Sequence, residues 1–154
     1  MNLLLWRHAE AEDGWPDKDR KLTARGETQA RQIAEWIRKR VSGDLHLLSS
    51  PALRCQQTAR MLNHPFETDK RLGVDSDVTR LLLAADWPEN DKTPEAAVII
   101  VGHQPILGQT AARLLSGQDT AWQMEKGSLW WFSSWKARAV LKAVIPAEFA
   151  QTEN

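Results

Sequence analysis

The apolar positions along the chain form short continuous runs separated by longer stretches with helical spacing. The first run, Leu3–Arg7, is apolar up to Trp6 and leads directly into His8. Runs of similar length follow at Leu45–Ser49 and Ala96–Gly102, and each is typical of a buried strand. The last of the three is β-branched and apolar at successive positions, so both of its faces must be covered. We therefore expect it in the middle of a largely parallel sheet.

Helices are expected between these runs. In the segment 21–41, one helical face carries Leu22, Ala30, Ile33, Ala34, Ile37 and Val41. Thr23 is the expected N-cap of this helix, and Gly43 is expected to end it. The same spacing and start signals predict further helices at Ala52–Leu62, from a start between Asp75 and Asp77 to Ala85, and from Pro105 to Leu115.

Two later apolar segments, Ser128–Trp135 and Ala139–Ile145, flank a short connection and predict an antiparallel hairpin. Together with the alternating strands and helices, they predict a three-layer α/β sandwich. Its central sheet is mostly parallel, and the hairpin forms an antiparallel edge. No repeat, low-complexity segment or linker divides the sequence. We therefore expect a single domain over residues 1–154, frayed beyond Phe149.

Composition narrows the class of protein. The 154 residues are 42% hydrophobic and 26% charged, which is the balance of an ordinary water-soluble domain. The 20 basic and 20 acidic residues cancel, which argues against binding to nucleic acid or to a membrane surface. Cys55 is the single cysteine and has no intrachain partner. With no signal peptide and no apolar run long enough to cross a membrane, we expect a cytoplasmic monomer.

The candidate chemistry lies where the predicted strands end. Ligands of parallel α/β sheets bind beyond the carboxyl ends of the strands. The first strand ends at Arg7 and His8, Arg54 follows the second strand, and His103 follows the central one. Together with two helix N-termini, these cations predict an anion site suited to a phosphoryl group.

Two imidazoles at one phosphoryl group also suggest a reaction. A neutral imidazole is a competent nucleophile, so His8 is the candidate that attacks phosphorus. Arg7, Arg54 and His103 would neutralise the phosphoryl oxygens, and water would then hydrolyse the phosphohistidine. The sequence contains no HExxH or CxxC pattern, so we expect no metal ion and no other cofactor.

Four segments resemble motifs of the histidine phosphatase superfamily, also called the phosphoglycerate mutase-like family. "RHAEA" is similar to its "RHG" signature, "LTARGETQA" to "LTxxGxxQA", "SSPALRCQQTA" to "SSPxxRxxQTA" and "VIIVGHQPILG" to "vxxVGHxPxLs". The motifs occur in the family's order and span residues 3–108. The resemblance implies a phosphoglycerate mutase-like fold, a phosphorylated His8, and a phosphate pocket formed by Arg7, Arg54 and His103.

Within that family, the opening "RHAEAEDGWPDKDRKLT" most resembles SixA-type phosphohistidine phosphatases. This resemblance makes Arg20, just before "LT", an additional candidate for phosphate or substrate binding. Ala9 replaces the family's usual glycine. We expect its carbonyl to accept a hydrogen bond from Nδ1 of His8, which leaves Nε2 free to attack.

The sequence does not single out a general acid. The candidates are Glu10, Glu12, Asp13, Asp75 and Asp77. A phosphorylated imidazole is a better leaving group than an alkoxide, so an enzyme for phosphohistidine needs little acid catalysis, whereas an enzyme for esters depends on it. We therefore expect a phosphohistidine phosphatase that acts on a protein such as a phosphotransfer domain or phosphocarrier.

Alternative functions use the same residues. One is a phosphatase for small phosphomonoesters. A mutase is disfavoured because the sequence lacks the insertions of a lid, and a phosphate-binding module without turnover is disfavoured by the intact site.

Several remaining side chains are assigned to packing. His46 and His64 are interpreted as structural, and Cys55 as a small buried residue. Trp130 and Trp131 are adjacent on a predicted strand and should face opposite sides of it. The other notable tryptophans, Trp15 and Trp87, either pack or rim the pocket as a docking surface for a protein, and packing is the preferred interpretation.

Overall fold

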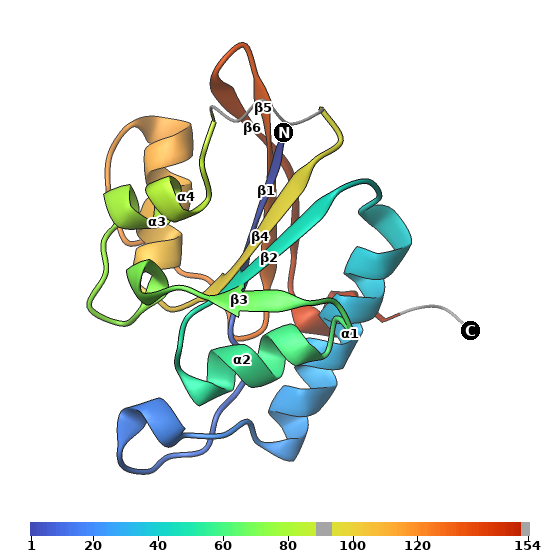
Figure 1. The fold of residues 1–154 in the computed structure, drawn as a ribbon, viewed down its shortest axis with the longest axis vertical. Coiled ribbons are helices and arrows are strands. Elements are labelled where there is room, and N and C mark those ends of the chain that lie inside the picture. Colours follow the sequence, from blue (N-terminus) through green and yellow to red (C-terminus); the bar gives the residue numbers. More distant parts are fainter. Residues whose placement is uncertain (89–93, 152–154) are drawn as a thin grey trace.

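The computed structural model describes residues 1–88 and 94–151 (Figure 1). Within these residues, six strands form one sheet. The strands are β1 Asn2–Arg7, β2 Leu45–Ser49, β3 Phe66–Thr68, β4 Ala97–Gly102, β5 Leu129–Trp135 and β6 Arg138–Ile145. The α-helices are α1 Ala24–Arg40, α2 Leu53–Arg60, α3 Val78–Ala84 and α4 Ile106–Ser116. Short 3-10 turns cover Asp17–Asp19, Lys70–Leu72 and Ala147–Phe149.

The sheet has the order β3-β2-β4-β1-β5-β6. β4 pairs in parallel with both β1 and β2, and β3 pairs in parallel with β2. β5 and β6 add the antiparallel edge. All six residues of β4 are buried, as expected for a strand that is apolar on both faces. The predicted α/β fold with a mostly parallel sheet and an antiparallel edge is therefore confirmed.

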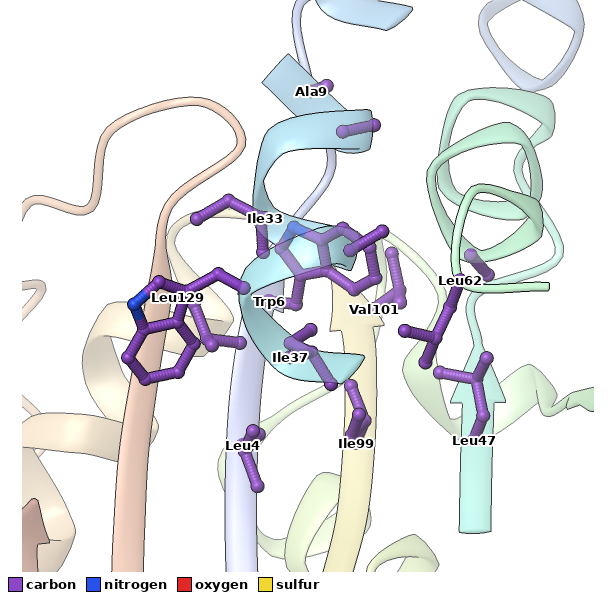
Figure 2. Packing of buried hydrophobic residues seen from close by; sticks show 14 of the residues in the cluster. Leu4, Trp6, Ala9, Ile33, Ile37, Leu47, Leu62, Ile99, Val101 and Leu129 are labelled. Carbon is purple, nitrogen blue, oxygen red and sulfur yellow. The ribbon is translucent and has the colours of Figure 1, made fainter. Parts of the chain in front are cut away.

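Side chains that alternate along the strands supply two separate cores. On one face, Leu4 and Ile99 pack beneath Ile33 and Ile37 of α1 (Figure 2). On the other face, Leu3, Leu5 and Ile100 pack in a second cluster with residues of α3 and α4. The two helical layers lie on opposite sides of the sheet in Figure 1. Because side chains alternate along each strand, the apolar residues are divided between the two faces of the sheet and hence between the two cores.

The adjacent tryptophans of β5 follow the same rule. Trp131 packs against the α1 side and meets Trp36 edge to face, with ring centroids 6.0 Å apart. Trp130 packs against the opposite cluster. Trp87 is also partly buried in that second cluster, as the packing interpretation predicts. Trp15 differs, because this residue is 91% exposed.

The starts of the helices follow their capping residues. The hydroxyl of Thr23 accepts a hydrogen bond from the amide of Gly26 at 2.9 Å, which confirms the predicted N-cap of α1. Asp77 caps α3 in the same way. The end of α1 differs from the prediction: the helix stops at Arg40 because Val41 is already extended, and Gly43, with φ +96°, lies in the connection to β2.

Two other parts of the chain were not predicted correctly. β3 was missed, because three residues on an edge strand carry too little hydrophobic pattern to be recognised. The chain also remains packed past Phe149. Ala150 is 2% exposed and lies in the core on the α1 side, so fraying does not begin where we expected it.

Candidate active site

Backbone hydrogen bonds tie three strand ends together. The amide of His8, just after β1, donates to the carbonyl of Gly102 at the end of β4. The amide of Ser50, just after β2, donates to the carbonyl of Val101. Side chains that follow these strands are therefore held at one edge of the sheet. Here the structure brings together His8, Arg54 and His103, and Arg7 is the last residue of β1, directly before His8.

His8 is 8% exposed, and its ring is oriented by the backbone. Its Nδ1 lies 2.8 Å from the carbonyl oxygen of Ala9, the contact expected from the sequence. Because a carbonyl only accepts hydrogen bonds, Nδ1 carries the proton and Nε2 keeps its lone pair. Burial lowers the pKa of His8 to about 3, so the imidazole is neutral at neutral pH.

His103 lies beside it, with the two ring centroids 5.4 Å apart and the planes inclined by 61°. Its Nε2 is 2.7 Å from the hydroxyl of Ser50, and its Nδ1 is 3.4 Å from Nη2 of Arg54. Arginine only donates, so Nδ1 accepts and Nε2 carries the proton toward Ser50. Burial and then the charge of Arg54 lower the pKa of His103 to about 4. Both imidazoles are therefore uncharged at neutral pH.

Backbone carbonyls anchor the two arginines. Arg54 comes from the first turn of α2, is 4% exposed, and donates from Nη1 to the carbonyl of Asp17. Arg7 donates from Nη1 to the carbonyl of Met124 at 2.6 Å. In the described part of the chain, the buried Nε atom of each guanidinium has no hydrogen-bond partner. Each guanidinium group thus has N–H donors that remain available to an oxyanion.

Asp17 is a part of the site that sequence reasoning missed. Its carboxylate accepts from Nη2 of Arg54 through Oδ2 and from Nη1 of Arg20 through Oδ1, both at 3.1 Å. Arg20, a candidate for phosphate or substrate binding, donates to this carboxylate and to the carbonyl of Glu12. Hydrogen bonding from Arg20, and then from Arg54, lowers the pKa of Asp17 against the opposing effect of burial. The three-residue spacing of Asp17 and Arg20 was the available signal, since it permits an ion pair within one turn.

The carboxylates considered as general acids lie in different parts of the structure. Glu10 accepts from the hydroxyl of Thr23 and lies near Arg25, at the start of α1. Asp77 is used as the cap of α3. Glu12 and Asp13 are exposed on the loop before α1. In the described part of the chain, no hydrogen bond or ion pair joins these four carboxylates to the histidine cluster.

Asp75, the remaining candidate, lines a groove of about 310 Å³ beside the site. Ser50 and Asp17 line the same groove, so it adjoins both His103 and Arg54. Its other walls come from the loop around Lys18 and from the segment that carries Lys70 and Arg80. The site therefore has a neighbouring groove with charged residues in its walls that is large enough for part of a substrate.

Cys55 also adjoins the cluster but has no sign of activation. Its Sγ is 3.6 Å from Nε2 of His103, and burial raises the pKa of the thiol to about 12. A buried neutral thiol is a poor nucleophile, so packing is its role here.

Among residues 1–88 and 94–151, no three His, Cys, Asp or Glu side chains are arranged to hold a metal ion. In the same residues, no helix has the length and apolarity needed to cross a membrane.

Comparison with known proteins places the chain in a family. Residues 3–73 match the model of the histidine phosphatase superfamily, branch 1. An uncharacterised protein of Picosynechococcus is 33% identical over 128 residues, covering 77% of this chain and 75% of the relative. The phosphohistidine phosphatase SixA of Escherichia coli is 26% identical over 123 residues, covering 77% of this chain and 76% of the relative.

Solved structures have the same fold. The protein histidine phosphatase SixA in complex with tungstate superimposes with a TM-score of 0.77 at 21% identity, covering 98% of this chain and 100% of the other. A mycobacterial glucosyl-3-phosphoglycerate phosphatase in complex with VO3 gives 0.72 at 21% identity, covering 92% and 96%. Fold and site define a phosphatase whose candidate nucleophile is an imidazole. The chain belongs to the histidine phosphatase superfamily.

Proposed function

We propose that this protein is a phosphohistidine phosphatase that removes the phosphoryl group from a histidine of another protein. One observation carries the proposal. Two neutral imidazoles and a buried arginine form one cluster, while the carboxylate that contacts it, Asp17, is held ionised by Arg20 and Arg54. An ionised carboxylate cannot protonate an alkoxide, so the cluster suits a leaving group that needs no protonation by the enzyme.

In the proposed first step, Nε2 of His8 attacks phosphorus from its lone pair. The bond between phosphorus and the substrate nitrogen breaks, and its electron pair stays on the substrate imidazole. Nδ1 of His8 already carries its proton toward Ala9, so the phosphorylated ring forms as a cation held by that carbonyl. Water then attacks phosphorus, the bond to Nε2 breaks, and inorganic phosphate and a proton are released.

Arg7, Arg54 and His103 are proposed to neutralise the phosphoryl oxygens during both steps. The free Nε donors of the two arginines support this role. A bound phosphoryl group brings negative charge next to Nδ1 of His103, which favours protonation there and adds a further cationic donor. Because side chains supply the positive charge, the proposed reaction requires no metal ion.

The first test is turnover of a phosphohistidine-bearing phosphotransfer domain beside a panel of small phosphate monoesters, in buffer containing EDTA. Rapid loss of phosphohistidine with slow ester hydrolysis is expected. Efficient ester turnover with inert phosphohistidine would overturn the substrate assignment and favour the small-molecule phosphatase. That second candidate is supported by the groove beside the site, whose volume of about 310 Å³ can hold a small molecule.

The second test addresses the nucleophile. His8→Ala should abolish turnover and should also abolish the acid-labile, alkali-stable label that wild-type protein acquires from radioactive substrate. His64→Ala is the matched control, because that imidazole contacts only its neighbour Pro65 among the described bonds. Retained turnover in His8→Ala would remove His8 from the mechanism. A wild-type protein that binds phosphate without turnover or label would indicate a binding module.

A further inference from the structure

Asp17 is placed where a carboxylate is unexpected. A phosphatase site collects positive charge, yet this carboxylate bonds directly to Arg54, the most deeply buried cation of the cluster. Its side chain is 47% exposed, whereas that of Arg54 is 5% exposed, so Asp17 stands between the arginine and solvent. It also lines the groove beside the site, together with Ser50. A group leaving from the phosphoryl site toward that groove therefore passes a fixed negative charge.

The carboxylate is held in place as well as ionised. Arg20 binds one oxygen, Arg54 binds the other, and the backbone carbonyl of Asp17 accepts a further bond from Arg54. A carboxylate oxygen has two acceptor positions, so each oxygen can still receive one more donor. The exposed fraction shows that this capacity faces solvent and the groove rather than the core.

The chemistry of phosphohistidine indicates which donor the Asp17 carboxylate can receive. The nitrogen–phosphorus bond of phosphohistidine breaks readily when the other ring nitrogen is protonated, because the imidazole then leaves as a neutral molecule. In the enzyme's own phosphohistidine, that proton is held by the carbonyl of Ala9. In an in-line transfer the substrate ring occupies the opposite side of phosphorus, and its ring proton needs an acceptor there too.

We propose that Asp17 selects phosphohistidine by accepting the N–H of the substrate's protonated imidazole as the ring leaves. This inference rests on the proposed function and names the feature that favours an imidazole over an alkoxide. The bond between phosphorus and the ring nitrogen breaks, its electrons remain on that nitrogen, and the N–H bond to Asp17 weakens as the ring becomes neutral. An anionic leaving group, such as a sugar acid, is repelled by the same carboxylate.

Other charges around the groove do not replace this contact. The groove is also lined by Lys18, Lys70, Asp75 and Arg80. Lys18 pairs with Asp19, and Arg80 with Asp77, and the three basic side chains present donors rather than acceptors. Asp75 is the only other carboxylate among the residues that line the groove, and the described bonds do not connect it to Arg54.

The experiment compares two leaving groups in two variants. Asp17→Asn keeps the shape of the side chain and removes its charge. Asp19→Asn is the matched control, because it removes a charge from the same turn and contacts Lys18 instead of Arg54. For each protein, kcat/KM is measured for phosphoimidazole and for p-nitrophenyl phosphate, and thermal unfolding confirms that the fold is retained.

Asp17→Asn should lower kcat/KM for phosphoimidazole by about tenfold or more, the effect of one charge-assisted hydrogen bond, and leave the ester value unchanged or higher. We also expect a change in the pH dependence of the single-turnover rate with phosphoimidazole at saturating enzyme. In the variant, the decline of this rate on the alkaline side should begin at a lower pH than in wild type, since Asp17 no longer favours the protonated ring. Asp19→Asn should change neither kcat/KM nor the pH dependence of the single-turnover rate.

Equal losses for both substrates would show that Asp17 only positions Arg54, and unchanged values for both would show that it does nothing in the reaction. Either result overturns the inference and leaves the proposed function standing, because the wild type still cleaves phosphoimidazole. A wild type that cleaves the ester but not phosphoimidazole overturns both.

Discussion

Acidification should destabilise this protein well before its carboxylates titrate, because the site buries two neutral imidazoles. The pKa of His8 is lowered to about 3 and that of His103 to about 4, against 6.5 for a free histidine. In the unfolded chain both rings take up a proton as the pH falls below 6.5, while in the folded chain both stay neutral. The stability that these groups supply is complete above pH 6.5 and is lost as the pH falls toward their folded values.

The size of the effect follows from linkage. Between pH 7.5 and pH 5.0, each ring protonates in the unfolded state and neither does so in the folded state. This difference lowers the free energy of unfolding by about 2 kcal/mol per histidine. The two together remove about 4 kcal/mol, a large part of the 5–15 kcal/mol that typically stabilises a domain. The depressed pKa of Asp17 adds nothing in this window, because its contribution is lost only at lower pH.

The assay is urea unfolding at pH 7.5, 6.5, 5.5 and 5.0, followed by the fluorescence of the eight tryptophans. The variant that isolates the effect is His8→Asn with His103→Gln, which keeps a donor toward Ala9 and one toward Ser50 but removes both titrations. The control is His46→Gln with His64→Gln, which changes two histidines outside the site.

Wild type and control should lose about 4 kcal/mol between pH 7.5 and 5.0, and the site variant should lose less than about 1 kcal/mol. An equal loss in the site variant would refute the reasoning, since the acid sensitivity would then come from other groups. A loss that disappears only in the control would assign it to the surface histidines instead.

Three further outcomes are expected. Ser50→Ala should cost about 1 kcal/mol in unfolding free energy and lower kcat by about tenfold, because Nε2 of His103 loses its buried acceptor. Gly26→Ala should destabilise the fold by more than about 2 kcal/mol in urea unfolding despite alanine's better helix propensity, because the new Cβ would lie 2.0 Å from the carbonyl oxygen of Glu10. Cys55 should resist a thiol reagent at pH 8 in the folded protein and react fully in urea, because burial raises its pKa to about 12.

Each of these outcomes has a control. Ser49→Ala removes a neighbouring hydroxyl that donates to the carbonyl of Ser50, and it should leave kcat unchanged. Thr28→Ala, on the exposed side of the same helix turn as Gly26, should be nearly neutral. Full activity in Ser50→Ala, native stability in Gly26→Ala, or rapid labelling of Cys55 in the folded protein would each contradict the corresponding argument.

Local pattern was sufficient to predict most of the framework. Apolar runs of five to seven residues identified β1, β2 and β4, because such runs are hydrophobic enough to need a covered sheet. Thr23 marked the start of α1, because its hydroxyl meets the amide three residues later in the same chain. The rule that parallel strands end at one edge then predicted that His8, Arg54 and His103 would meet.

Other features depend on contacts that no local pattern encodes. The short strand β3 exists because β2 offers it a free edge, and Ala150 is buried because the α1 face has room for it. Asp17 meets Arg54 across 37 residues of chain, and the same carboxylate also accepts a hydrogen bond from Arg20.

The sequence by itself thus determined every strand except β3, the helices and the candidate site residues, because strand and helix periods and capping are local properties. Only the tertiary structure decided the proton position on His103, the free donors of the arginines and the fixed charge at Asp17. Those properties arise from burial and from partners distant in the chain, which exist only after the strand ends have been brought together.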